Sequence, residues 1–502
     1  MAYKDIQARS VGPELARLLP HDGLPWYRKH HLLRLNYSLL CLFLLSASVG
    51  YDGTLMNGLQ ALPRWQVFMN NPTGAWLGFV NAVQNLSAFV LYPVVAWCSD
   101  RYGRKTTLGI SFLWLALAVG LQSAAINPTM FVFGRLFIGA SASFTSGFAP
   151  ILMAETAYPT HRGIVTAMFM CGWYVGSFLA AWVTFGTRNA PGNWSWRIPS
   201  LLQCAIPILA LPGFVMAPES PRWLVSQERV EEAHAFLIRY HAGGEENTPL
   251  ANFELQEIIN SLALEARYRR SSSWLDLLRG RGNLGIVSYY LAPVLRSIGI
   301  TSVKKQTMIS GFLQLWNLVL SVGAAFNVDR FGRRPLFLVS GVGMLCAYIV
   351  ISGLSGSFAQ TNIASTGTAV IPFLFLYYGF YDIAFTPLLV SYTCEIWPYD
   401  LRAKGLAPGM NSTRVALFFN TFVNPTILDA IAWKYYNVYC AILVVISVTI
   451  WLWYPETKGY TLEETAVLFD RDVDKEIRGS KESTLTVEDK GALSNTSHVE
   501  RA

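Results

Sequence analysis

Two charged residues stand inside apolar segments of this sequence. Asp52 lies in SVGYDGTLMNG, within an apolar run over 35–57, and Arg135 lies in FVFGRLFIG, within a run over 129–153. A carboxylate in such surroundings is costly and usually faces a cavity or an oppositely charged partner. Protonation of Asp52 would remove its charge and release Arg135, so the pair predicts a proton switch. The alternative is a permanent ion pair that holds two helices together.

Further charged residues recur in two parts of the chain. DRYGRK at 100–105 returns as DRFGRR at 329–334, ETAYPTHRG at 155–163 returns as EIWPYDLRAKG at 395–405, and PESPR at 218–222 returns as PETKG at 455–459. Acids accompany the bases at fixed spacing, which predicts cytoplasmic ion pairs that form in one conformation and break in the other. A bias of bases toward cytoplasmic loops is the alternative. The predicted gate residues are Asp100, Arg101, Arg104, Glu155, Arg162, Asp329, Arg330, Arg333, Glu395 and Arg402.

The composition explains why such charges matter. The 502 residues are 52% hydrophobic and only 14% charged, whereas a soluble chain carries about a quarter charged residues. The charges lie in short clusters between long apolar runs, so we predict a polytopic membrane protein. The net charge of +7 then belongs to loops and does not indicate nucleic-acid binding. The seven cysteines show no CxxC spacing and no catalytic arrangement stands out, so we expect no metal site, no cofactor and no enzyme activity.

Twelve apolar runs are candidates for membrane spans, each of which needs about 20 residues. They lie near 35–57, 75–97, 106–126, 129–153, 164–186, 198–217, 284–300, 307–327, 335–356, 369–394, 406–431 and 436–455. A polar stretch separates the sixth run from the seventh. The expected division is a cytoplasmic segment over 1–34, a six-helix half over 35–217, a cytoplasmic loop over 218–282, a second half over 283–455, and a tail over 456–502, mostly disordered by composition.

The distribution of Lys and Arg predicts the orientation. Basic residues are enriched after the second, eighth and tenth runs, as expected of cytoplasmic loops. Both termini and the central loop are therefore expected inside. Asn193-Trp194-Ser195 would then be an exterior glycosylation sequon, a triplet that also occurs by chance.

Three repeated motifs in the same order indicate two six-helix halves, the parallel-repeat architecture of major-facilitator transporters. The stretches YDGTLMNGLQALPRWQ, IAFTPLLVSYTCEIWPYDLRAKG and FNTFVNPTILDAIAWKYY resemble the fungal lactose-permease-like and hexose transporter branch of the sugar-porter family. The resemblance covers residues 35–460. It implies an all-α integral membrane protein with the major-facilitator fold, whose halves are related by a pseudo-two-fold axis. It also implies proton coupling, because symporters of this family carry Asp at the position of Asp52.

The same resemblance implies where a sugar would bind. Its expected contributors are an Asn on the eleventh span, here Asn420, and aromatic residues on the tenth, here Tyr381. Trp173 on the fifth span and Tyr289 on the seventh are further candidates. The family pattern places an amide at Met170, and methionine cannot supply the paired donor and acceptor of an amide.

The seventh run is too short. Apolar residues from 284 to 295 make about 18 Å of helix, against a hydrocarbon core of about 30 Å. We interpret it as the exterior half of a span, so the seventh helix is expected to be truncated. The natural explanation is a lost segment of roughly 20–30 residues, enough to complete the crossing. Alternatively, the residues over 274–278 dip into the membrane interface and the helix tilts.

The sequence as a whole predicts a sugar transporter that works by alternating access. Sugar:proton symport of a hexose, or of a disaccharide of the lactose or cellobiose type, is favoured. The expected partners are a small sugar, a proton and the lipid bilayer, for a monomer in the plasma membrane. Three rivals remain open: a sugar sensor that does not transport, an uncoupled facilitator, and a product that does not fold.

Overall fold

Long helices dominate the computed structural model. It describes residues 13–20, 25–246, 248–271, 302–361, 363–388, 392, 399–454 and 456, although the side chains at 264–271, 326–331, 399–413 and a few single positions are excluded. The predicted seventh run, with Tyr289 and the proposed truncation, lies outside the described residues. In the described part every regular element is helical.

The first half contains six spans as predicted. Its membrane helices are α3 (His30–Leu59), α5 (Gly74–Tyr102), α6 (Arg104–Ser123), α7 (Pro128–Thr156), α8 (Arg162–Thr187), and the sixth span formed by α9 (Trp194–Leu201), η2 (Leu202–Cys204) and α10 (Ala205–Met216). Capping side chains define where some of these helices begin. The Asn127 side chain accepts a hydrogen bond from the backbone N–H of Met130 at 2.8 Å, which caps the start of α7.

The second half contributes five described helices. They are α16 (Val303–Phe331), α17 (Arg333–Thr361), α18 (Ala364–Ala384), α20 (Tyr399–Ile431), and α21 (Tyr435–Trp453), which follows the short η3 (Ala432–Lys434). Ten helical spans among the described residues are long and apolar enough to cross a membrane. The run over 406–431 lies in α20 but is not one of the ten, and polar side chains such as Arg414, Asn420 and Asn424 interrupt it.

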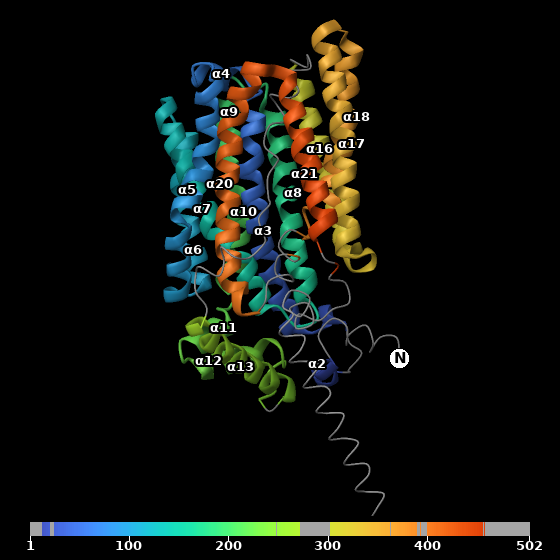
Figure 1. The fold of residues 1–502 in the computed structure, drawn as a ribbon. Coiled ribbons are helices and arrows are strands. Elements are labelled where there is room, and N and C mark those ends of the chain that lie inside the picture. The colour runs from blue at the N-terminus through green and yellow to red at the C-terminus, as the bar shows by residue number, and fades with distance from the viewer. Residues whose placement is uncertain are drawn as a thin grey trace, which may run out of the picture.

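Six further described helices do not belong to the membrane spans. They are α2 (Pro13–Leu18), η1 (Trp26–Arg28), α4 (Pro63–Phe68), and α11 (Pro221–Ser226), α12 (Val230–Tyr240) and α13 (Pro249–Ser271) of the central loop. Figure 1 shows α11, α12, α13 and α2 together at one end of the bundle, with α4 at the other end. His241, directly after α12, contacts Glu254 of α13 at 2.7 Å and the carbonyl oxygen of Thr156 at 3.4 Å. These contacts attach the central loop to α7.

Small residues allow the helices of the first half to pack closely. A methyl group placed on Gly176 of α8 would lie 1.6 Å from the carbonyl oxygen of Ala47 on α3. Close approach through small residues is the usual way that membrane helices associate, because lipid offers no hydrophobic driving force between them. The buried cores consist of apolar residues together with many serines and amides, whereas large apolar side chains such as Leu113 and Val445 are exposed. The bundle thus presents an apolar outer surface.

The two halves meet along two helix pairs, α5 with α20 and α8 with α16. A methyl group on Gly78 of α5 would lie 2.2 Å from the carbonyl oxygen of Phe422 on α20, so the two backbones touch there. On the other side, a methyl group on Gly311 of α16 would lie 3.0 Å from the indole nitrogen of Trp182 on α8. Both pairs position side chains at the interface between the halves.

Candidate functional site

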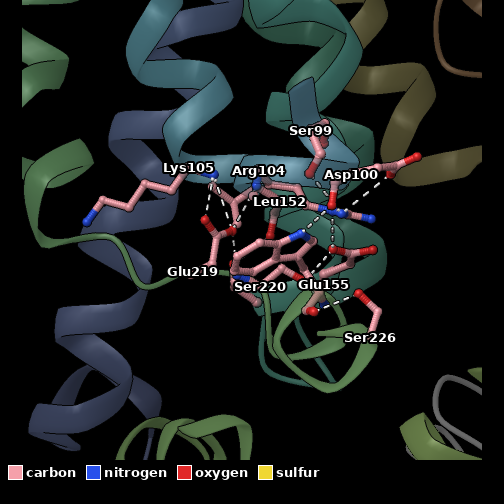
Figure 2. A network of polar contacts seen from close by, with 12 residues as sticks. Ser99, Asp100, Arg104, Lys105, Leu152, Glu155, Glu219, Ser220 and Ser226 are labelled. Atoms are coloured by element: carbon pink, nitrogen blue, oxygen red, sulfur yellow. Dashed lines mark hydrogen bonds and ion pairs between the residues drawn. The ribbon is translucent and has the colours of Figure 1, made fainter. Parts of the chain in front are cut away.

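The repeated DRYGRK motif forms a tight junction between α5 and α6. Gly103 ends α5 with a φ of 96°, a conformation that favours glycine. Glu219 of the PESPR motif reaches this junction, and its carboxylate oxygens accept hydrogen bonds from the backbone N–H of Arg104 at 3.0 Å and of Lys105 at 3.2 and 3.1 Å (Figure 2). A side chain at residue 103 would collide with that carboxylate, since an added methyl group would lie 2.4 Å from it.

Glu219 therefore caps the N-terminus of α6, where a negative charge is favourable. Burial raises the pKa of this carboxyl, and the backbone N–H groups of Ser220, Lys105 and Arg104 oppose that shift, as does the Arg104 charge. The PESPR and PETKG motifs were recognised as a repeat, but no role was predicted for their glutamates. Their equivalent positions, each after the sixth span of its half, could have indicated that the two glutamates have the same role.

Ion pairs of the predicted gate form next to this cap. Arg104 lies 3.8 Å from the Asp100 carboxylate and 3.5 Å from that of Glu155, which also accepts a hydrogen bond from Ser220. The indole N–H of Trp223 donates to the carbonyl oxygen of Asp100 at 3.0 Å, so α11 also contacts this network.

Two predicted gate residues of the first half lie at its margin. Arg101 and Arg162 are exposed, and no ion pair with a described residue joins either of them to the network. Of the predicted gate residues of the first half, Asp100, Arg104 and Glu155 are the ones that ion pairs between described residues bring together.

The second half repeats the cap. Gly332, at the corresponding position of DRFGRR, has a φ of 91°. Glu456 of the PETKG motif accepts hydrogen bonds from the backbone N–H of Arg333 at 2.9 Å and of Arg334 at 3.1 Å. The motif repeat thus corresponds to a repeat in geometry. The side chains of the other predicted gate residues of this half, Asp329, Arg330, Glu395 and Arg402, lie outside the described part.

Asp52 and Arg135 lie beside each other, deep in the first half. They are 3% and 2% exposed, so both are shielded from solvent. Arg135 Nη1 donates to the backbone carbonyl oxygen of Asp52 at 3.4 Å. Oδ1 of the Asp52 carboxyl is buried without a hydrogen-bond donor among the described residues. A carboxyl in such a place gains little from hydration and responds strongly to the charge beside it.

A polar cavity opens beside this pair, between the halves. Its walls come from α3, α5 and α7 of the first half and from α20 of the second. Arg135 and Arg414 contribute its two charged side chains, and its other polar lining residues are Asn57, Asn81, Gln84, Asn85 and Thr421. The amide nitrogen of Asn85 donates to the hydroxyl of Thr421 at 3.4 Å and joins the halves at the cavity wall.

A second acid within a membrane span was not predicted from the sequence. Asp382 of α18 is 0% exposed. Its carboxylate accepts hydrogen bonds from the hydroxyl of Tyr174 on α8 and, at 2.8 Å, from that of Thr386. The side-chain amide of Asn317 on α16, in the orientation that satisfies its hydrogen bonds, donates to it at 3.2 Å. Asp382 could have been found from the sequence, because it is an acid within the apolar run over 369–394 and Asp52 was selected by the same criterion.

The predicted sugar residues lie at different places. Asn420 accepts a hydrogen bond from Asn424 at 2.6 Å and another from Tyr439 of α21 at 3.2 Å, which places it in a polar cluster between α20 and α21. Tyr381 stacks on Phe385, with the ring centroids 5.8 Å apart. Trp173 packs edge-on against Tyr174 at 5.2 Å. None of these three side chains lines the polar cavity beside Arg135.

Two other sequence features are also resolved. Met170 packs against the apolar core of the first half, as expected of a residue that makes no polar contact. Asn193 of the predicted sequon is exposed directly before α9. Its side chain is thus accessible, as a modified asparagine must be.

Comparisons with known proteins agree with this architecture. A family model described as "Sugar (and other) transporter" matches residues 39–469. The chain is 26% identical over 450 residues to a high-affinity glucose transporter of Kluyveromyces lactis, covering 83% of this chain and 81% of the relative. It is 24% identical over 485 residues to high-affinity glucose transporter 1 of Candida albicans, covering 90% and 88%.

Solved structures give the same fold. The partially occluded inward-open conformation of the xylose transporter XylE from E. coli superposes with a TM-score of 0.69, at 22% identity, over 86% of this chain and 100% of that one. A structure of the same proton:xylose symporter bound to 6-bromo-6-deoxy-D-glucose gives a TM-score of 0.68. These likenesses confirm the predicted all-α major-facilitator fold. The family match extends over most of the chain, and the protein therefore belongs to the sugar transporter family of the major facilitator superfamily.

Proposed function

We propose that this protein takes up a sugar together with a proton by alternating access. The observation that carries the proposal is the buried pair of Asp52 and Arg135 beside a polar cavity between the halves. A permanent structural ion pair would not need to adjoin such a cavity. The relatives named as glucose transporters, and the solved proton:xylose symporter, support the same reading.

Proton coupling follows from the charge of one carboxyl group. Ionised Asp52 attracts Arg135, and the attraction is strong because both groups are buried. Protonation removes that attraction and leaves Arg135 able to contact a molecule in the cavity. Binding of the proton and binding of the substrate are thereby coupled through one guanidinium group, as transport coupled to a proton gradient requires.

The cytoplasmic networks supply the gate. Asp100, Arg104 and Glu155 join α5 to α7 in the first half, and the Glu219 carboxylate joins the same junction to the end of the sixth span. Charged contacts near the membrane surface are individually weak, so a conformational change can break them at modest cost. We infer that they form in one orientation of the transporter and open in the other.

The substrate class and the setting are inferred. Hexoses come first, because the relatives are named as glucose transporters, and disaccharides of the lactose or cellobiose type come second. We place the protein in the plasma membrane, with both termini cytoplasmic, as a monomer.

The test is uptake by purified full-length protein in liposomes. With an inward proton gradient, labelled hexose is expected to accumulate above its external concentration. Asp52→Asn should lose accumulation and keep exchange of labelled for unlabelled sugar, because its side chain can no longer release a proton. Glu246→Gln, which changes an exposed acid of the central loop, is the matched control. Downhill uptake alone would indicate a facilitator, and binding without uptake would indicate a sensor; either result overturns symport.

A further inference from the structure

The cavity between the halves is lined by an unusual set of charges for a sugar site. Arg135 reaches it from α7 and Arg414 from α20, so each half supplies one guanidinium group. None of the residues that line the cavity is acidic. Asp52 lies beside Arg135, whereas Arg414 meets no acidic side chain among the described lining residues, and a neutral sugar does not need this second cation.

The uncharged side chains of the cavity also favour a ligand that carries hydrogen-bond acceptors. Asn81 is 8% exposed, and its oxygen already accepts a hydrogen bond from Gln60 at 3.1 Å. Its amide nitrogen is buried without an acceptor among the described residues. A buried donor in this state costs free energy until a partner reaches it. An acceptor-rich group in the cavity would provide that partner.

We propose that the cavity binds a sugar that carries a carboxylate, such as a uronate, with the carboxylate held by Arg135 and Arg414. Planar guanidinium groups match carboxylates by paired hydrogen bonds, which a hydroxymethyl group cannot reproduce. The inference rests on the proposed transport function and names its substrate class. The hydroxyl groups of the sugar would contact the amides and Thr421.

Proton binding then has a defined consequence for charge. When Asp52 is protonated, the substrate carboxylate takes over as the anion beside Arg135. One proton and one monoanion enter together, and the net charge moved is zero. The titratable or charged groups that interact with Asp52 are Tyr51 on α3, Arg135 on α7 and Cys204 on η2, with Arg414 of α20 across the cavity. The cavity face of α5 presents neutral amides.

The experiment compares D-glucuronate with D-glucose, which differ only in a carboxylate in place of a hydroxymethyl group. Full-length protein in liposomes is measured for the affinity of each compound and for current during proton-driven uptake. We expect the wild type to prefer glucuronate by at least about tenfold, the usual effect of a hydrogen bond to a charged group. Uptake of glucuronate should carry no net current.

Variants at Arg414 test the contribution of this second cation of the cavity. Arg414→Gln should lower the ratio of glucuronate affinity to glucose affinity by about tenfold to hundredfold. Arg414→Lys keeps the charge and should retain part of the preference, which separates a lost contact from a misfolded protein. Arg64→Gln, an exposed arginine at the start of α4, is the control and should leave the ratio unchanged.

The possible results are distinguishable. Uptake of glucose with no preference for glucuronate, or an equal effect of Arg414→Gln on both compounds, overturns this inference and leaves the transport function standing. A wild-type protein that inserts correctly but moves neither compound overturns the transport function as well. A glucuronate preference that persists unchanged in Arg414→Gln shows that the anion binds elsewhere and overturns the proposed site.

Discussion

The hydroxyl of Tyr174 on α8 donates a hydrogen bond to the carboxylate of Asp382 on α18, so one buried contact joins the two halves. Thr386 and Asn317 complete the surroundings of this carboxylate. The contact lies on the α8 and α16 side of the interface, whereas the polar cavity lies on the α5 and α20 side. Each side of the interface thus has its own polar contact between the halves.

Loss of this contact should change how the halves separate. Tyr174→Phe removes one donor to a buried carboxylate, a loss of about 1.5–3 kcal/mol. Because the contact joins the halves, the variant should shift the populations of outward-facing and inward-facing molecules, measured by cysteine labelling from each side. Ser141→Ala is the control, since the Ser141 hydroxyl donates to the carbonyl oxygen of Ser111 within the first half at 3.0 Å. Equal shifts in both variants would show that the contact between Tyr174 and Asp382 has no specific effect on these populations.

Removing the charge from the α6 cap should destabilise the cytoplasmic end of the first half. Glu219→Gln replaces a carboxylate that accepts hydrogen bonds from two helix N–H groups. We expect a loss of about 1–3 kcal/mol, seen as a lower melting temperature in detergent. Glu246→Gln, on the exposed surface, should melt like the wild type. Because Glu456 occupies the equivalent place in the second half, Glu456→Gln should lower the free energy of unfolding by a similar amount. A wild-type melting temperature in Glu219→Gln would show that Glu219 does not stabilise α6 as a cap.

The packing of α3 on α8 should tolerate no added carbon at Gly176. A methyl group there would lie 1.6 Å from the Ala47 carbonyl oxygen, which is backbone and cannot move aside. Gly176→Ala should therefore reduce the yield of folded protein on size-exclusion chromatography, with a cost of about 1–3 kcal/mol or more. Gly186→Ala, at the far end of the same helix, has open space around it and serves as the control. A normal yield from Gly176→Ala would mean that the two helices are farther apart.

Stability should depend on pH through His161, which lies between α7 and α8 outside the spans. Burial, and then the charge of His241, lower the pKa of His161 below its ordinary value of about 6.5. The unfolded chain therefore takes up a proton at a higher pH than the folded chain does. The stabilisation is present above about pH 6.5 and is lost as the pH falls through that value toward the folded pKa.

The measurement is the melting temperature at several pH values between about 7.5 and 5.5, the range around the ordinary histidine pKa. His161→Gln should reduce the slope of melting temperature against pH in that range. His30→Gln, at the exposed start of α3, should keep the wild-type slope. An unchanged slope in His161→Gln would rule out this residue as its source.

Much of the architecture could be predicted because it depends on patterns of residues that are close together in the sequence. Apolar runs located the spans, and the repeated motifs indicated two equivalent halves, in which Gly103 and Gly332 both have positive φ. Asp52 and Arg135 were paired because each is an isolated charge in an apolar run. Asp382 satisfied the same rule and was overlooked, and its partner Tyr174 is 208 residues away.

The cavity shows why the site itself was harder to predict. Arg414 and Arg135 come from different halves, and neither the spacing nor the type of either residue indicates that they line one cavity. The resemblance directed attention to Asn420, Tyr381 and Trp173, which lie away from that cavity. Contacts between distant segments depend on which helix faces touch, and a single sequence records the faces but not their pairing.

The backbones of α5 and α20 touch where Gly78 meets Phe422, and in the alternating-access mechanism that we propose this contact would be the fulcrum of the rocking motion. Asn85, on the cavity wall, lies about 10 Å farther along α5, and Asp100, in the cytoplasmic network, lies about 33 Å along it. A rocking motion about the fulcrum therefore displaces the cytoplasmic charges roughly three times as far as the cavity wall. In the mechanism that we propose, the charged network would therefore move a large distance while the residues that line the cavity move little.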